Sequence, residues 1–186
     1  GIIANGLNTV SVTKANTGTW TLSGANTYSG TTTVSGGTLA LTGSAKSTTG
    51  TLTMNGGTVD LGADLGLGNA ALINGTGGTI NATGGGKILL NIAAGDVGVA
   101  NGGTLSVNAV IANGSQSSVD FWNTASGTGI VLLNATNTFT GAPNLQSGVV
   151  TVNKINDNGV AGGLGTSGTI NLGAGTSTAT LKYTGA

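Results

Sequence analysis

The sequence predicts an all-β fold, a parallel β-helix that runs as one continuous solenoid over residues 1–186. Composition is the first reason: Glu and Arg are absent while Thr, Val, Ile, Gly and Asn abound, which favours strands and turns over helices. The second is a low aromatic content beside a high aliphatic content, which suits a thin core repeated many times. The third is a short signature that returns about every 20 residues.

The signature is Gly-Gly-Thr followed by an apolar residue, any residue and a second apolar residue. Full copies begin at Gly36, Gly56, Gly77 and Gly102, and a shortened form covers Gly168 to Leu172. The full copies start 20, 21 and 25 residues apart, a spacing typical of the coils of a parallel β-helix. We therefore expect about eight or nine coils of roughly 20–25 residues, each strand pairing with its equivalents above and below.

The chain begins with an apolar segment, an Asn-Gly turn and an alternating run in which Val10 and Val12 share one face. The same order returns from Ala109 to Phe121. This repetition predicts an internal duplication, with modules at 1–108 and 109–186, the second of them incomplete.

The next stretch, Gly18 to Leu41, contains three short alternating runs separated by Gly, Asn and Ser, and it returns without a gap from Gly129 to Val152. Apolar residues correspond to apolar residues where identity is lost, which indicates that a shape is repeated rather than a reaction. The pairs are Gly18 with Gly129, Trp20 with Val131, Leu22 with Leu133, Asn26 with Asn137, Thr27 with Thr138, Tyr28 with Phe139, Gly30 with Gly141, Val34 with Leu145, Gly37 with Gly148, Leu39 with Val150 and Leu41 with Val152.

Alternation within the signature strands predicts which side chains face the interior. The expected inward residues are Leu39, Leu41, Val59, Leu61, Ile80, Leu105 and Val107. The expected outward columns are Thr38, Thr58, Thr79 and Thr104, and beside them Ala40, Asp60, Asn81 and Ser106. Further strands are expected at 52–54, 71–73, 88–92, 130–133 and 179–183, and bulging loops at 62–69 and 94–100. No helix is well supported, because the best candidate, 93–99, holds two glycines and has no cap.

The first copy of the repeated stretch carries a family resemblance. It reads Gly18-x-Trp20-x-Leu22-Ser23-Gly24-Ala25-Asn26-Thr27-Tyr28-Ser29-Gly30-Thr31-Thr32-x-Val34-x-x-Gly37-Thr38-Leu39. This string resembles the passenger-associated transport repeat of bacterial autotransporter passengers, also called the autotransporter-associated β-strand repeat. The resemblance implies a right-handed parallel β-helix, displayed on a Gram-negative-type surface or secreted, in which the repeat assists secretion or folding.

The second copy departs from this pattern at Val131, Phe139, Pro143 and Leu145. Pro143 is the departure with a backbone consequence, because proline has no N–H to donate to a strand ladder. We expect it at a corner or at a locally unpaired strand.

Several kinds of site are excluded by composition. The segment has neither His nor Cys, so it cannot hold a His-based triad, a thiol nucleophile or a metal site of nitrogen and sulfur ligands. Its five Lys and five Asp balance and the Lys are not clustered, so nucleic acid is not an expected partner. No stretch approaches the about 20 apolar residues of a membrane span. The start lacks a leader pattern and an initiator Met, so we expect an excised or processed piece.

Carboxylates could still support acid–base chemistry, since a pair of them can cleave a glycosidic bond. Asp60 and Asp64 form the only close pair in the sequence, and Asp96, Asp120 and Asp157 stand alone. We expect Asp60 to point outward and Asp64 to lie in the following loop, at a solvated corner rather than a catalytic site.

Three other sequence patterns resemble known binding sites. The run Asn156 to Gly159 offers oxygen ligands for a cation such as Ca²⁺, but it lacks the spacing of known calcium loops, so we expect an Asx-rich turn. The run Gly84 to Lys87 lacks the spacing and the following helix of a phosphate-binding loop. The threonine column suggests an ice-binding array, but the column beside it is not threonine. No catalytic, metal or cofactor residue is therefore expected.

The expected function is structural: a non-catalytic stalk or fibre unit of a bacterial protein that is secreted or displayed on the cell surface. Its expected partners are adjoining coils of the same or identical chains, stacked end to end, because neither end shows a capping element. One alternative is an adhesin face that binds glycans or proteins, for which an exposed Trp122 beside Phe121 is the candidate. The other is a polysaccharide-processing enzyme with two converging carboxylates.

Overall fold

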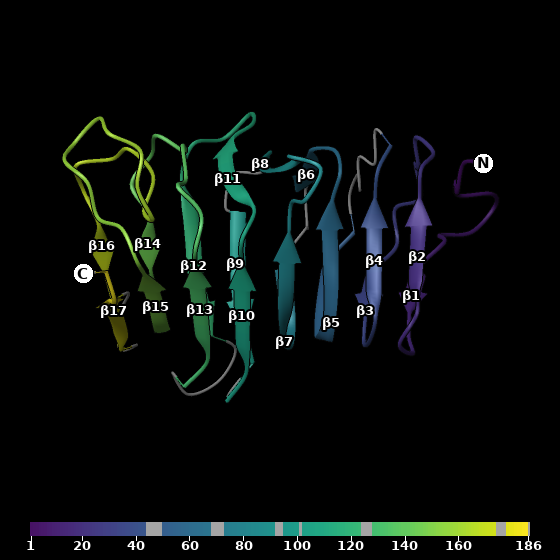
Figure 1. Cartoon of the computed structure of the whole chain (residues 1–186), viewed down its shortest axis with the longest axis horizontal. Helices are drawn as coiled ribbons and strands as arrows, with labels where there is room; N and C mark the ends of the chain where they lie inside the picture. The colour runs from purple at the N-terminus through teal and green to yellow at the C-terminus, as the bar shows by residue number, and fades with distance from the viewer. Residues whose placement is uncertain are drawn as a thin grey trace.

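The computed structural model describes residues 1–43, 50–67, 73–91, 95–100, 102–123, 128–173 and 178–185. Its strands stand side by side along one axis, and the two chain ends lie at opposite ends of the resulting rod (Figure 1). Strands pair in parallel, and the described residues contain no helix. The predicted all-β solenoid of parallel strands is confirmed.

The strands form two long ladders and one short ladder around a common interior. The first ladder contains β1 (Val12–Lys14), β3 (Thr32–Val34), the first part of β5 (Leu52–Leu61), the start of β7 (Ile73–Asn81), β9 (Gly95–Val99), β12 (Val119–Asn123), β14 (Asn144–Leu145) and β16 (Asn171–Leu172). The second contains β2 (Thr19–Leu22), β4 (Thr38–Leu41), the later parts of β5 and β7, β10 (Thr104–Val107), β13 (Ile130–Leu133), β15 (Gly148–Val152) and β17 (Ala179–Tyr183). The short ladder contains β6 (Leu65–Leu67), β8 (Lys87–Leu90) and β11 (Val110–Asn113).

The number of coils is slightly smaller than predicted. The solenoid has about six turns, against the eight or nine coils expected from the signature period. Each long ladder contains eight strand segments. The first and last segments lie at the open ends of the rod, so only the segments between them pair with a strand on both sides.

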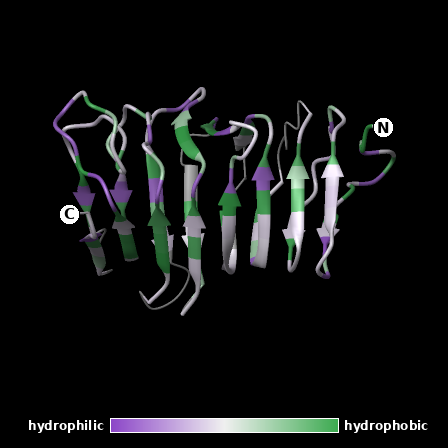
Figure 2. Ribbon diagram, viewed as in Figure 1, coloured by the Kyte–Doolittle hydropathy of each residue, from purple (hydrophilic) through white to green (hydrophobic). Residues whose placement is uncertain are grey.

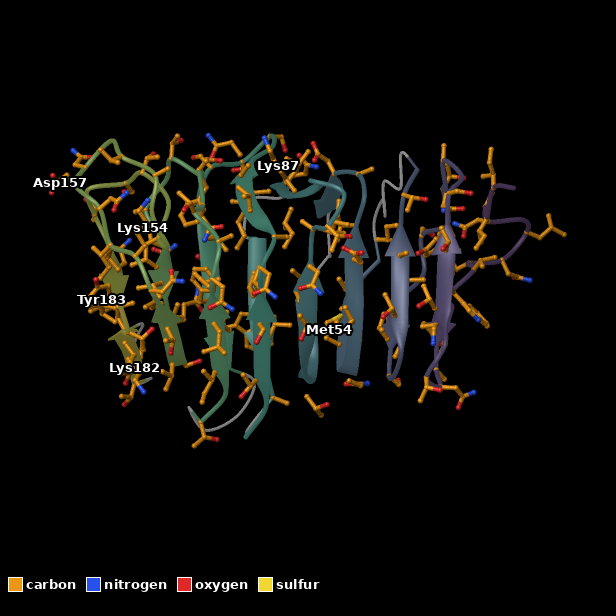
Figure 3. The ribbon with its side chains drawn as sticks, in the orientation of Figure 1. Met54, Lys87, Lys154, Asp157, Lys182 and Tyr183 are labelled. Carbon is orange, nitrogen blue, oxygen red and sulfur yellow. The ribbon has the colours of Figure 1, made fainter. Side chains whose placement is uncertain are left out.

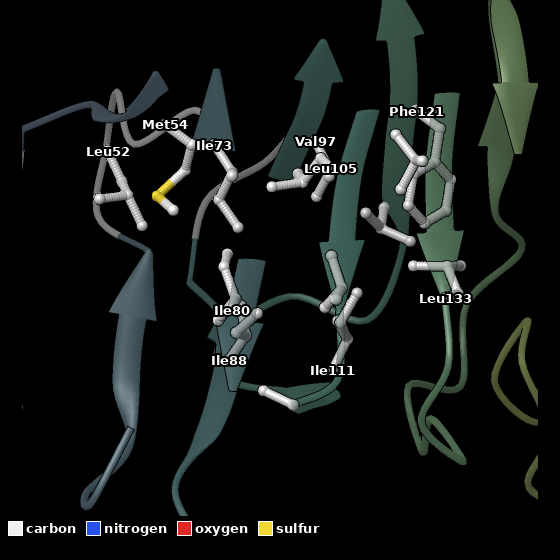
Figure 4. Packing of buried hydrophobic residues seen from close by; sticks show 14 of the residues in the cluster. Leu52, Met54, Ile73, Ile80, Ile88, Val97, Leu105, Ile111, Phe121 and Leu133 are labelled. Atoms are coloured by element: carbon white, nitrogen blue, oxygen red, sulfur yellow. The ribbon is translucent and has the colours of Figure 1, made fainter. Parts of the chain in front are cut away.

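The interior is a continuous stack of aliphatic side chains, and all seven residues predicted to face inward are buried. Figure 4 shows how side chains from successive coils, such as Leu52, Ile73 and Val97, follow one another along the rod. Hydrophobic residues occur along the whole length of the molecule rather than at one centre (Figure 2). The core is therefore thin but repeated, as expected for a solenoid.

The predicted column of threonines is wrong at its fourth member. The observed register is Thr38↔Thr58, Thr58↔Thr79 and Thr79↔Ser106. Thr104 faces Gly77 instead, so β10 is displaced by two residues from the alignment of the signatures, and Ser106 leaves the second predicted column. A shift of two residues returns every side chain to the same face of the sheet, so the alternation of inward and outward positions survives it.

Two further expectations about loops are also wrong. The segment predicted to bulge at 94–100 contains β9, which lies in the first ladder between β7 and β12. Its glycines weaken the strand pattern, but Val97 and Val99 both fill the interior. In the other predicted loop, 62–69, residues Leu65–Leu67 form β6.

The shortened signature lies in a different ladder from the full copies. Asn171–Leu172, its last two residues, form β16, which pairs with β14 in the first ladder. The strands expected at 52–54, 130–133 and 179–183 are confirmed, and β8 (Lys87–Leu90) covers residues 88–90 of the strand expected at 88–92, of which residue 92 lies outside the described residues. In the strand expected at 71–73, residues 71 and 72 lie outside the described residues.

Candidate functional site

Buried polar side chains are few in the described part of this solenoid, and three of the four lie in the two copies of the repeated stretch. In the described part of the chain they are Lys14, Asn26, Thr32 and Asn137. Asn137 occupies the position that corresponds to Asn26 in the second copy. Because a buried polar group is costly unless it is hydrogen-bonded, these residues indicate where the fold depends on specific bonds.

Both asparagines bind the backbone of the preceding coil. Asn26 accepts a hydrogen bond at Oδ1 from the N–H of Ile3 (2.8 Å) and donates one from Nδ2 to the carbonyl of Gly24 (3.0 Å). Asn137 accepts at Oδ1 from the N–H of Ile111 (2.8 Å) and donates from Nδ2 to the carbonyl of Gly163 (2.7 Å). The second copy thus also holds the segment that follows it.

Backbone bonds reinforce the same contacts. The N–H of Thr27 donates to the carbonyl of Ile3 and the N–H of Thr138 to that of Ile111, each over 2.9 Å. Residues 23–31 form no strand, and 134–143 contribute only an isolated bridge at Asn137. An asparagine side chain carries the same amide donor and acceptor as the backbone, so it supplies pairing where no regular ladder is present.

In each copy a second asparagine, on the preceding coil, forms hydrogen bonds to the motif. Asn5 accepts from the N–H of Ser29 (3.1 Å) and donates to its hydroxyl (2.6 Å). Asn113 accepts from the N–H of Thr140 (3.0 Å) and donates to its hydroxyl (3.0 Å). Two short strings, Ile-Ala-Asn and Asn-Thr-aromatic-Ser/Thr, are therefore joined in the same way in both copies.

The aromatic residue of the motif is buried in both copies, but its polar partner changes. The hydroxyl of Tyr28 is 2.7 Å from that of Thr32. In the second copy Phe139 replaces Tyr28 and Pro143 replaces Thr32, so both hydroxyls are lost together. Pro143 is buried and lies immediately before β14, outside the strand, so it matches the expected unpaired position and not an exposed corner.

A glycine after the aromatic residue lets adjacent coils approach each other. The N–H of Gly30 donates to the carbonyl of Val10, and a Cβ on Gly30 would lie 2.4 Å from that oxygen. At Gly141 a Cβ would lie 2.9 Å from the carbonyl oxygen of Ser117, to which the Gly141 N–H donates. The motif thus combines a buried amide, a buried ring and a close backbone approach.

Asp60 and Asp64 bind different residues of the next coil, whereas the register places Asp120 directly beside Asp96 of the adjacent strand β9. Asp60 accepts from the N–H and the hydroxyl of Thr83, and Asp64 accepts from the N–H of Lys87 (2.9 Å). Asp120 accepts from the side-chain amides of Asn144 (2.6 Å) and Gln146 (2.9 Å). Each of these three carboxylates binds the next coil.

Asp157 and Asp96 are the two aspartates for which the structure describes no side-chain hydrogen bond. Asp157 is exposed on the loop that protrudes near Lys154 (Figure 3), and the side chain of Asp96 lies outside the described residues. In the run Asn156 to Gly159, the N–H of Val160 donates to the carbonyl of Asp157, which closes a turn. The described residues hold no group of three or more His, Cys, Asp or Glu side chains that could bind a metal.

The glycine run before Lys87 is a tight connection between coils. Gly85 has φ of +81°, and a Cβ on Gly86 would lie 2.3 Å from the carbonyl oxygen of Ala63. A strand, β8, follows the run where a phosphate-binding loop would lead into a helix. With Thr104 outside the threonine column, an ice-binding array also loses its regularity.

The two aromatic residues of β12 divide between interior and surface. Phe121 is fully buried, whereas Trp122 is half-buried and lies against Gly98, where a Cβ would come within 2.9 Å of its ring. The indole N–H of Trp122 is buried and has no partner among the described residues. Trp122 therefore presents only part of its ring to the surface.

Sequence reasoning missed Lys14, which is only 1% exposed. Its signal was present, because Lys14 continues the alternation of Val10 and Val12 and so falls on the inward face. It also missed that Asn5 and Asn113 pair with the repeat, although both follow a shared Ile-Ala string.

Comparison with known families agrees with this geometry. The model of the passenger-associated-transport-repeat matches residues 12–41 and 124–152, which contain all four of the buried polar side chains described above. No curated protein and no solved structure gives a significant match to the chain. Within the described part of the chain, no helix has the length and apolar character needed to cross a membrane. The repeat and the parallel β-solenoid together fit an autotransporter passenger, and this chain carries two passenger-associated-transport-repeats.

Proposed function

We propose that this segment is a non-catalytic structural unit of an exported bacterial passenger, and that its two repeats hold neighbouring coils together. The observation that carries this proposal is the shared bonding of Asn26 and Asn137, each of which accepts the N–H of an isoleucine in the preceding coil. A stalk exposed to proteases depends on such bonds, because a coil that opens locally is a site of cleavage.

Limited proteolysis of the purified chain tests the proposed role of the repeats. We expect the chain to resist a broad-specificity protease and the double variant Asn26→Ala/Asn137→Ala to be cut at least tenfold faster. The matched control is Asn108→Ala/Asn134→Ala, which removes two exposed asparagines that bond to each other over 2.8 Å. Equal cleavage rates in the two double variants would refute a special role for the repeats.

Export is supported by the repeat family, whose members belong to passengers. The test is to add protease to intact cells of the natural host. We expect the chain to be degraded on the cell surface or recovered from the medium. A chain reached only after lysis would show that the proposal of export is wrong.

We also propose that the open faces of the end coils take a further coil, from the same polypeptide or from an identical chain. At the two ends, the inward columns of the second ladder finish on aromatic rings, Trp20 at 57% exposure and Tyr183 at 51%. Sedimentation over a range of concentrations tests stacking of identical chains. Association that weakens on Trp20→Lys supports it, and a concentration-independent monomer contradicts it.

The absence of catalysis rests on the carboxylates, since Asp60, Asp64 and Asp120 are each engaged by the next coil. A screen against polysaccharides tests this part of the proposal. Turnover that Asp120→Asn abolishes would overturn it.

A second candidate function, binding of a glycan through the outward face of β12 and β14, has one observation in its favour. Trp122 lies two residues from Asp120 on the same face of β12, and the carboxylate of Asp120 is held by Asn144 and Gln146, so a partly exposed ring lies near oriented polar groups. Binding on a glycan array that is lost with Trp122→Ala but kept with Trp20→Ala would establish it.

A further inference from the structure

Lys14 is the one charged side chain among the buried polar groups of the described structure. It lies in the inward column of the first ladder, where β1 pairs Lys14 with Val34 and β3 pairs Val34 with Met54. Both neighbours are buried, so the next two coils place apolar side chains where the first places a cation. A charge in such a place is strongly unfavourable unless the fold satisfies it.

The fold satisfies it with backbone oxygens. The ammonium Nζ donates to the carbonyls of Ala15 (2.6 Å), Asn16 (2.8 Å) and Gly36 (3.1 Å). An ammonium has three N–H groups, and these three bonds use all of them. The ammonium also lies over the ring of Trp20, with Nζ 5.9 Å from the ring centroid.

We call the carbonyls of Ala15, Asn16 and Gly36 the cradle of Lys14, and the corner beside Lys14 has the backbone shape that forms it. Asn16 has φ of +59° and is the non-glycine residue with positive φ in the described chain. Its carbonyl and that of Gly18 face Gly37 of the next coil, where a Cβ would lie 2.5 Å and 2.3 Å from the two oxygens. The same Cβ would lie 2.6 Å from Nζ, so a glycine is required at this place.

The cradle distinguishes one register from others that the apolar pattern allows. A displacement of two residues keeps every side chain on its face, and β10 shows that the Gly-Gly-Thr signatures tolerate such a shift. In β1, a shift of two residues would move the strand by about 6.6 Å relative to β3. Lys14 would then lose the carbonyl of Gly36, and the corner would meet residues that carry a Cβ.

We propose that Lys14, together with Gly36 and Gly37, fixes the register of the first coil on the second. Lys14 is a positioning residue: two of its donors are satisfied within its own corner, and the third only by the correct partner coil. This inference goes beyond the proposed function and depends only on the fold, so it holds or fails independently of export.

Disulfide mapping tests the proposal directly, because the chain has no cysteine of its own. Thr13 pairs with Thr33, and cysteines at these two positions would report the observed register. Cysteines at Thr13 and Thr31, or at Thr13 and Ser35, would report a shift of two residues in either direction. Adjacent strands are about 4.8 Å apart, which is within the range that a disulfide can bridge.

With Lys14 in place, we expect only the Thr13–Thr33 pair to form a disulfide. With Lys14→Met, which keeps the length of the side chain without its charge, we expect a shifted pair to reach a tenth or more of the yield of the native pair. Lys14→Arg keeps a charge and should restore the single register, and Lys87→Met removes an exposed lysine as the control. A Lys14→Met chain that forms only the Thr13–Thr33 disulfide would overturn the proposal.

A measurement on the unaltered chain covers the case in which Lys14→Met fails to fold. An amine-reactive reagent should modify Lys87, Lys154 and Lys182, which lie on the outside of the rod, at least a hundredfold faster than Lys14 (Figure 3). Peptide mass spectrometry reads each site separately. Equal labelling of Lys14 would show that the cradle does not hold the ammonium, and would also overturn the proposal.

Discussion

Asn137→Ala is the substitution from which this structure predicts the clearest loss of stability. Asn137 is 1% exposed, and its side chain satisfies the N–H of Ile111 and the carbonyl of Gly163 through bonds of 2.8 and 2.7 Å. Alanine would leave both backbone groups buried without these partners. Each such group costs about 1–3 kcal/mol, so the free energy of unfolding should fall by about 2–6 kcal/mol.

The corresponding change in the first copy should cost less. Asn26 is also buried, but its bonds to Ile3 and Gly24 are only partly buried, so water can replace them. We expect Asn26→Ala to cost about 0.5–1.5 kcal/mol, the net value of a solvated hydrogen bond.

Urea unfolding followed by far-ultraviolet circular dichroism measures both losses, provided that the slope with urea is unchanged. Amide hydrogen exchange adds a local readout, since Asn137→Ala should expose the N–H of Ile111 to exchange. Asn134→Ala, at an exposed asparagine, serves as the control. If Asn137→Ala costs no more than Asn134→Ala, and Ile111 stays protected, the assignment of Asn137 as a bond between coils is wrong.

Three further predictions concern the same fold. Gly30→Ala should lower the free energy of unfolding by about 1–3 kcal/mol, because its Cβ would lie 2.4 Å from the carbonyl oxygen of Val10. Gly18→Ala should be nearly neutral, because nothing lies within 4 Å of a Cβ at that position. Similar unfolding midpoints for the two variants would contradict this prediction. A double-mutant cycle of Tyr28→Phe and Thr32→Val should give a coupling of about 0.5–1.5 kcal/mol, because their hydroxyls are 2.7 Å apart, and strictly additive losses would show that this bond contributes nothing. Phe121→Ala should lower the free energy of unfolding by about 3–5 kcal/mol by opening a cavity in a fully buried site, and a loss below 1 kcal/mol by calorimetry would indicate that the core there is not close-packed.

The inward columns were predictable because the alternation of a strand is local. Leu39, Val59 and Ile80 each stand between residues of the opposite face, and all three are buried. The register was not predictable in the same way: the signature places Thr104 beside Thr79, but Ser106 takes that position. A period of two residues cannot distinguish a strand from the same strand shifted by two.

The candidate site was predictable as a motif but not as a set of bonds. The correspondence of Asn26 with Asn137 is visible in the sequence, whereas their partners, Ile3 and Ile111, are 23 and 26 residues away. Which backbone groups meet an amide depends on how one coil lies on the next, and no local pattern contains that information.

The sequence by itself determined the strand-forming composition, the side of each strand that faces the core and the repeat family, because each of these depends on neighbouring residues or on a pattern along the chain. The tertiary structure alone decided the register between coils, the inclusion of Gly95–Val99 in the first ladder and the burial of Lys14. These depend on backbone groups from a different coil, which compensate for weak strand propensity in β9 and for a buried charge at Lys14. The physical reason is that stacking satisfies groups that a single coil leaves exposed.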